Sequence, residues 1–223
     1  MNYSGIPDSI LRSIPLVPRD RRVSLLVRHA HRPDPEPGSY GNEIELSREG
    51  IVAAEQLGTT LSHFSAGRLQ SSSMPRAVAT ASAIAKGAGW NVPLEEDWRL
   101  GMHGPFVIDP IVAGPLILKI GAAEMIRRQL HNADPPPGMR PTSEGVVLIL
   151  QFLSKSLDAA PALDLNVTHD NIMATTIGAL LGVDFRDDNW PSFLEGLFIW
   201  REGSSLVGVW RGKRIGLLSD EQC

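Results

Sequence analysis

The feature that most constrains the fold is a junction that occurs more than once along the chain. At each junction a short apolar run is followed by polar residues and then by a helical pattern. The first junction begins with Val23 to Val27, which suits a central strand buried on both faces, and Arg28 and His29 follow at once. A later junction begins with the run LDLNV and places His169 and Asp170 at its end. Strands that alternate with helices in this way are typical of α/β folds.

A middle junction has the same form. The segment RLQSSSMPRAVATA predicts a short strand, a Ser-rich turn and a helix that Pro75 opens and Gly87 or Gly89 closes, so Arg76 falls in its first turn. The carboxyl ends of parallel strands meet at one edge of a sheet, where ligands bind. The sequence therefore predicts a three-layer α/β sandwich with a mostly parallel central sheet, helices on both faces, and its polar residues gathered at one edge.

The other segments complete this fold. LSREGIVAAEQLG predicts a helix capped by Ser47, and SEGVVLILQFLSKSL predicts a second amphipathic helix. Two apolar runs around the EGSS turn predict a hairpin that brings an antiparallel element to the sheet. Residues 100–141 are rich in Gly and Pro and show no strand and helix alternation, which indicates a small cap inserted beside the site. Within it, the apolar run IVAGPLILKIGAA is too short to span a bilayer and indicates a buried helix or a pocket wall.

Length and composition fit one soluble catalytic domain over residues 1–223, with the cap inside it. The chain has 223 residues, 43% hydrophobic and 21% charged, and a net charge of -4, which argues against nucleic acid as a partner. The single cysteine, Cys223, excludes an intrachain disulfide. The start of the chain lacks an unbroken apolar signal segment and no run is long enough to span a bilayer, so we expect a cytoplasmic protein without a membrane partner.

The residue types at the three junctions point to phosphoryl chemistry. A phosphoryl group in transfer spreads negative charge over three oxygens, and arginine donates to such a group with a planar fork that lysine lacks. Arg28, Arg32 and Arg76 supply that charge. The sequence holds no HExxH motif, no Cys/His spacing and no cluster of carboxylates at the junctions, so we predict that neither a metal nor a cofactor is needed.

A nucleophile and an acid complete the predicted site. A neutral imidazole can attack phosphorus, and a covalent phosphohistidine divides one difficult displacement into two easier ones. His29 lies between the arginines in the sequence, and Asp170 can supply the proton that a leaving alkoxide requires.

These blocks resemble the histidine phosphatase superfamily, which includes cofactor-dependent phosphoglycerate mutases and histidine acid phosphatases. The resemblance rests on LLVRHAHR, LSREGIVAAEQLG, SSSMPRAVATA and VTHDN, in the family's order, over about residues 23 to 182. It implies that His29 is the phosphorylated residue, that Arg28 and Arg32 are its phosphate ligands, that Arg76 matches the family's second arginine and that His169 is the second histidine. We expect Arg28, Arg32, Arg76 and His169 to hold the phosphoryl oxygens. Ala30 replaces the glycine of the family's Arg-His-Gly-x-Arg signature, which is a small change.

The proton donor has two interpretations under this resemblance. In the mutase-like branch it is a glutamate after the second arginine, where this chain offers Glu95, Glu96 and Asp97 in EEDWRLGMHGPF. In the acid phosphatase branch it is the aspartate directly after the second histidine, which Asp170 matches without adjustment. We therefore favour Asp170 and place the chain closer to the acid phosphatase branch.

His103, between two glycines of the predicted cap, is a candidate substrate contact or a turn residue. The sequence predicts hydrolysis of a small phosphorylated metabolite at acid-side pH. Phosphoglycerate mutase-like transfer and a non-catalytic phosphate-binding domain are the alternatives. The sequence gives no indication of the substrate's identity or of the oligomeric state.

Overall fold

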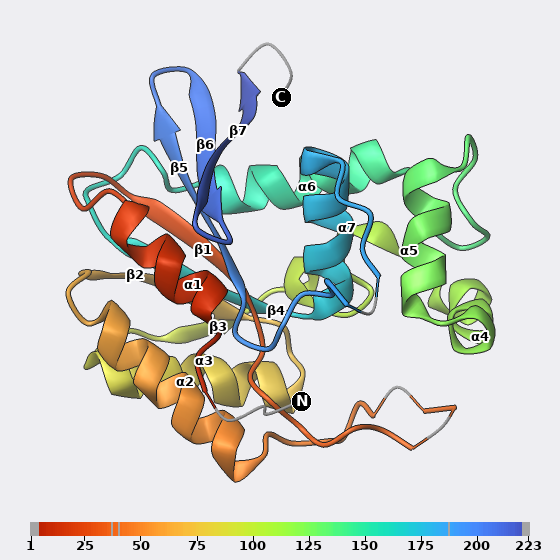
Figure 1. The fold of residues 1–223 in the computed structure, drawn as a ribbon, viewed down its shortest axis with the longest axis horizontal. Helices are drawn as coiled ribbons and strands as arrows, with labels where there is room; N and C mark the ends of the chain where they lie inside the picture. The colour runs from red at the N-terminus through yellow and green to blue at the C-terminus, as the bar shows by residue number, and fades with distance from the viewer. Residues whose placement is uncertain (1–4, 37, 40, 187, 220–223) are drawn as a thin grey trace.

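The computed structural model describes residues 5–36, 38–39, 41–186 and 188–219 (Figure 1). Within these residues the centre of the molecule is a seven-stranded sheet in the order β3-β2-β4-β1-β5-β6-β7. Four neighbouring strands are parallel: β3 (Leu94–Glu96), β2 (Ala66–Ser71), β4 (Leu163–Thr168) and β1 (Val23–Arg28). Three antiparallel pairings then add β5 (Gly196–Glu202), β6 (Ser205–Trp210) and β7 (Lys213–Ser219).

Helices cover both faces of the sheet (Figure 1). One face carries α1 (Asp8–Ser13), α2 (Arg48–Leu61) and α3 (Pro75–Ala88), and the other carries α6 (Thr142–Ser154) and α7 (Asp170–Leu181). The three-layer α/β fold with a parallel core is therefore confirmed. A short 3-10 helix, Ile14–Leu16, follows α1 and adds Ile14 to the core.

The core explains why β1 ends where it does. Every residue of β1 and of β4 is buried, as expected for central strands covered on both faces. Along β1, Leu25 and Val27 contact the core on the α2 and α3 side, whereas Leu26 belongs to the core under α6 and α7. Polar residues follow directly after this buried run, so they lie at the edge of the sheet.

The helices that carry site residues begin and end as the sequence predicts. The Oγ of Ser47 accepts a hydrogen bond from the Gly50 amide at 3.0 Å and caps α2. Pro75 is the first residue of α3, and Gly89 ends it with a φ of 70°. Helices α2 and α3 approach closely, because a Cβ on Gly58 would overlap the carbonyl oxygen of Ile84. Arg76 is thereby fixed at the start of a well-anchored helix.

Residues 100–141 depart from the expectation of an irregular segment. They contain the 3-10 helix Gly104–Phe106 and two α-helices, α4 (Pro110–Ile120) and α5 (Ala122–His131), and the 3-10 helix Trp98–Leu100 precedes them. Asp109 caps α4 by accepting from the amides of Ile111 and Val112. The helices α4 and α5 extend past α7 at one end of the molecule (Figure 1). The run IVAGPLILKIGAA thus forms a helix, α4, which was one of its two predicted forms, whereas α5 was not predicted.

The carboxyl-terminal part is larger than the predicted hairpin. The strands β5 and β6 form that hairpin, but β7 adds another antiparallel strand through a turn at Arg211 and Gly212, whose φ angles are 49° and 72°. Two successive positive φ angles are characteristic of a tight type I′ hairpin turn. In the described residues no helix is both long enough and apolar enough to cross a bilayer.

Candidate active site

The ends of β1 and β4 bring the two predicted histidines together. Arg28 pairs with Thr168 as the last residues of the two strands, and the His29 amide donates to the Thr168 carbonyl at 2.9 Å. His169 follows Thr168, so the ring centroids of His29 and His169 lie 5.3 Å apart. Both rings are almost completely buried.

The hydrogen bonds of His29 define its tautomer. Its Nδ1 lies 2.8 Å from the Ala30 carbonyl oxygen, which can only accept, so Nδ1 carries the proton. Its Nε2 therefore holds a lone pair, and it accepts from Arg76 Nε at 3.2 Å. Burial, with the nearby His169 and Arg28, holds the pKa of His29 well below 6.5. His29 is thus a neutral imidazole at neutral pH, with one nitrogen available for attack.

Arg76 and Arg32 bring positive charge to this nitrogen. The Nη1 of Arg76 donates to the carbonyls of Gly41 at 3.0 Å and Asn42 at 3.3 Å. Burial and the nearby charge of Arg32 lower the pKa of Arg76 to about 10, which leaves it protonated at neutral pH. Arg32 donates from Nη1 to the Pro33 carbonyl, while its buried Nε has no hydrogen-bond partner among the described residues. An anion at this point would satisfy that donor.

Asp170 forms an ion pair at the other side of the site. Its Oδ2 lies 2.9 Å from Arg28 Nη2 and accepts from Trp190 Nε1 at 3.2 Å. Burial acts to raise the pKa of Asp170, but Arg28, His29 and the Trp190 hydrogen bond outweigh it and hold that pKa below the usual range. The carboxyl group is therefore charged in this arrangement.

His169 is fixed through one nitrogen. Its Nε2 lies 2.7 Å from Ser72 Oγ, an oxygen that accepts from the Met74 amide at 3.2 Å. With the proton of a neutral ring on Nδ1, Nε2 accepts the hydrogen of the Ser72 hydroxyl. Its Nδ1 is buried and has no partner among the described residues. Burial and the charge of Arg76 lower the pKa of His169 to about 3, so the ring is neutral at neutral pH. Nδ1 is the atom left to contact a phosphate oxygen.

Several residues of this site were missed by sequence reasoning. Phe193 lies with its ring centroid 4.0 Å from the Arg28 guanidinium carbon and 5.6 Å from the His29 ring. Thr80 accepts from the Ala30 amide at 3.0 Å and fixes the loop after β1. Trp190 and Phe193 come from the connection between α7 and β5, whose sequence has no motif that would have found them. Ser72 stood inside the quoted SSS turn, and only the fold reveals its contact.

The alternative acids lie elsewhere. Glu95 and Glu96 are exposed on β3, the edge strand at the parallel end of the sheet. Asp97 caps the 3-10 helix Trp98–Leu100 and forms a 2.6 Å ion pair with Arg99. Their described contacts do not include His29 or His169. Asp170 is the candidate acid that the fold brings to the histidines.

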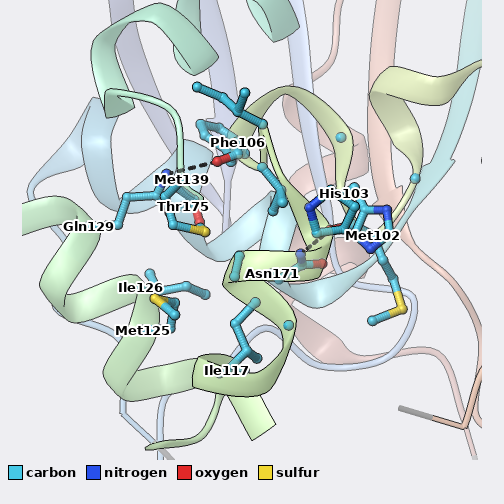
Figure 2. Close-up of a pocket in the computed structure, with 18 of the residues that line it drawn as sticks. Met102, His103, Phe106, Ile117, Met125, Ile126, Gln129, Met139, Asn171 and Thr175 are labelled. Atoms are coloured by element: carbon cyan, nitrogen blue, oxygen red, sulfur yellow. Dashed lines mark hydrogen bonds between the residues drawn. The ribbon is translucent and has the colours of Figure 1, made fainter. Parts of the chain in front are cut away.

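The two remaining histidines of the region have different surroundings. His31 Nδ1 lies 2.8 Å from Ser47 Oγ, so His31 takes part in fixing the start of α2. His103 is exposed and lies on the wall of a cavity of about 530 Å³ that adjoins Asp170 (Figure 2). Its role as a substrate contact stays a prediction. Among the described residues, no group of three or more His, Cys, Asp or Glu side chains is placed to hold a metal ion.

The fold of the chain is shared with solved structures that are phosphoglycerate mutase-like. The fold matches a phosphoglycerate mutase from Bacillus anthracis str. Sterne at 18% identity, with a TM-score of 0.55 over 90% of this chain and 94% of that one. It matches Bacillus stearothermophilus YhfR at 18% identity, with a TM-score of 0.60 over 86% and 97%.

A phosphoserine phosphatase variant from Entamoeba histolytica, in complex with phosphoserine, has the same fold at 14% identity, with a TM-score of 0.54 over 90% of this chain and 98% of that one. Residues 24–101 match the model of the histidine phosphatase superfamily (branch 1). This stretch of the chain resembles that superfamily, and the chain as a whole shares the fold of the phosphoglycerate mutase-like structures. The expected closeness to the acid phosphatase branch is not confirmed by this match. No curated protein matches the chain significantly.

Proposed function

We propose that the chain hydrolyses small phosphate monoesters through a phosphohistidine on His29, without a metal ion. The observation that carries this proposal is the state of His29: Nδ1 bonds the Ala30 carbonyl, and Nε2 keeps its lone pair beside the Arg76 guanidinium. A lowered pKa keeps the ring neutral, and a neutral imidazole next to fixed cations is suited to attack a phosphoryl group.

The reaction has two steps. The Nε2 of His29 attacks phosphorus, the bond from phosphorus to the ester oxygen breaks, and the leaving oxygen takes a proton from Asp170. Water then attacks the phosphohistidine, the bond from phosphorus to nitrogen breaks, and the proton released by water returns to Asp170. Arg28, Arg32, Arg76 and His169 Nδ1 hold the phosphoryl oxygens in both steps.

The acid role of Asp170 depends on its ion pair. With Arg28 at 2.9 Å the carboxylate is charged, and a charged carboxylate cannot donate a proton. A substrate dianion that binds Arg28 adds negative charge close to Asp170, which raises its pKa and favours protonation. This requirement predicts that esters with poor leaving groups are hydrolysed faster on the acid side of neutrality.

The first test is hydrolysis of an aryl phosphate from about pH 4 to pH 8 with a chelator present. We expect turnover in the wild type and a loss of turnover of at least about a thousandfold in His29→Ala. The control is His63→Ala, which should not change turnover, because His63 is exposed and has no described contact with the site. A phosphoryl group trapped on the wild type, stable in alkali and released by acid, would identify the intermediate. Turnover unaffected by His29→Ala would refute the mechanism.

The acid is assigned by a second variant. Asp170→Asn should slow an alkyl phosphate by about 10²–10⁴-fold, because its alkoxide needs a proton, and slow a nitrophenyl phosphate far less. Equal loss on both esters would show that Asp170 positions Arg28 instead. Transfer of the phosphoryl group to an added alcohol in preference to water would favour the mutase-like alternative. Tight phosphate binding without turnover would favour the non-catalytic phosphate-binding domain.

A further inference from the structure

The cavity beside Asp170 begins close to the nucleophile. Met102 lines it, and the Met102 sulfur lies 3.2 Å from Arg76 Nη2, while Nε of the same arginine contacts His29. Asp170 and Asn171 line the same end, and Asn171 Nδ2 donates to the Met102 carbonyl at 2.6 Å. One arginine therefore connects the phosphate site with the wall of the cavity.

The rest of the cavity is built from the segment 100–141 and is mostly apolar. Figure 2 shows Ile117 of α4 together with Met125 and Ile126 of α5 on one side, and Phe106 and Met139 on another. Among the described lining residues Asp170 is the only Asp, Glu, Lys or Arg, and it lies at the phosphate end. The cavity beyond that end therefore offers neither a cation nor an anion from these residue types.

This lining selects against one class of substrate. A second phosphate or a carboxylate on the substrate would lose its hydration in this cavity, whose described lining residues include no arginine or lysine. Burial of such an unpaired charge is costly. An apolar group gains free energy on entering the same space. The volume of about 530 Å³ lies within the range of about 300–1,000 Å³ typical of small-molecule sites.

The wall is also held in place before any ligand binds. Gln129 of α5 is buried and donates from Nε2 to the carbonyls of Arg140 at 3.0 Å and Phe106 at 3.4 Å. Thr142 Oγ1 donates to the Gln129 carbonyl at 2.7 Å, which joins the start of α6 to α5. A preformed cavity needs little ordering on binding, so apolar contact with it contributes directly to affinity.

We infer that the substrate is the phosphate monoester of an apolar alcohol, with the phosphate at His29 and the hydrocarbon part between α4, α5 and the 3-10 helix Gly104–Phe106. This inference rests on the proposed function for the role of His29, and it adds the substrate class. It also sets the chain apart from enzymes whose substrates carry a second anionic group.

Binding of n-alkylphosphonates tests the cavity independently of turnover, because their carbon to phosphorus bond is not hydrolysed in this reaction. Calorimetry from the butyl to the octyl compound should show Kd falling by up to about fourfold per added CH2, the equivalent of ~0.8 kcal/mol. The heat capacity change should become more negative along the series. A Kd that does not vary with chain length would overturn the inference.

A pair of variants on one helix locates the effect. Ile117 lines the cavity, whereas its neighbour Leu118 is 44% exposed and does not. Ile117→Glu should remove most of the chain-length dependence and weaken octylphosphonate binding at least tenfold, with little change for methylphosphonate. Leu118→Glu should leave both Kd values unchanged. Equal effects of the two variants would contradict the assignment.

Hydrolysis of the matching alkyl phosphates separates the two proposals. Turnover that requires His29 and rises with chain length supports both. If turnover requires His29 but does not depend on chain length, and the Kd of the phosphonates does not depend on it either, the apolar substrate class is overturned and the phosphatase proposal remains. If the Kd of the phosphonates falls with chain length but no ester is hydrolysed, the phosphatase proposal is overturned and the apolar binding site remains.

Discussion

The two ends of the site differ in how they are built. At the phosphate end, His29, Arg76 and Asp170 are fixed by hydrogen bonds and an ion pair between buried or half-buried side chains. At the cavity end, Ile117 and Met125 of α4 and α5 offer only apolar surface. The phosphate end thus depends on particular atoms at particular places, while the cavity depends on volume and polarity.

This difference explains why the sequence indicates the phosphate end residue by residue and the cavity end only as a segment. Phosphoryl transfer requires a nucleophile and several planar cationic donors, and few residue types meet that demand. An apolar wall tolerates many combinations of residues of suitable total volume. The sequence therefore indicates the phosphate end through particular residue types, whereas the individual residues of the cavity wall are identified only by the fold.

Among the variants that compare the two ends, the largest expected effect comes from Arg76, which lies between them. Arg76→Lys keeps the positive charge but removes the fork that contacts both His29 Nε2 and the Met102 sulfur. Loss of such a fixed donor typically costs about 10²–10³ in kcat. We expect that loss for short and long alkyl phosphates alike, measured as kcat/KM for each ester, because the fork acts on the phosphoryl group.

Arg127→Lys is a suitable control, because this exposed arginine of α5 pairs with Glu124 and is remote from the phosphate. It should change kcat/KM little for any ester. A loss in Arg76→Lys that grows with chain length would break the distinction, since it would show that the arginine shapes the cavity as well as the phosphate site.

The next effect is the pH dependence of stability, which should originate at the phosphate end. The folded-state pKa values of His29 and His169 lie below 6.5, for His169 at about 3, so the unfolded chain binds protons that the folded protein does not. Stability from these groups is complete above about pH 6.5 and is lost as the pH falls below it, by up to about 1.4 kcal/mol per pH unit for each histidine.

Urea unfolding at several pH values between about 7 and 4 measures this slope. His63, although exposed, also has a lowered pKa, mainly because its ring is partly desolvated. The test therefore compares the slope of His169→Gln with that of the wild type. The variant should show a clearly shallower loss of unfolding free energy toward acid. An unchanged slope would mean that the buried histidines do not control acid stability.

The fold was predictable where each element carried its own signals. The buried run of β1, the Ser47 cap of α2 and the Pro75 start of α3 agree with the structure, because local preference and burial point to the same element. The segment 100–141 was predictable in part. Its run IVAGPLILKIGAA indicated a buried helix or a pocket wall, and the structure has α4 there, lining the cavity, with Pro110 as its first residue and Pro115 within it. The second helix, α5, was not predicted.

Tertiary contacts account for the other omissions. The turn before β7 uses Arg211 at a positive φ, without the Asn-Gly pair that usually marks such a turn. Trp190 and Phe193 reach Asp170 and Arg28 from a connection whose sequence shows no period. Their place in the site follows from the return of the chain from α7 to β5, which lies beside β1.

The smallest expected effect concerns Ser47, which supports the phosphate end from outside. Ser47 caps α2 and contacts His31, but it is not in contact with His29. Ser47→Ala should lower the unfolding free energy by about 1 kcal/mol, the usual cost of a lost N-cap, and change kcat/KM less than severalfold for short and long esters. Ser62→Ala, at the other end of the same helix, is the matched control and should cost less, because its hydroxyl only bonds an exposed carbonyl. If Ser47→Ala slowed the hydrolysis of every ester tenfold or more, the loop that carries His31 would take part in catalysis, and the start of α2 would belong to the phosphate site.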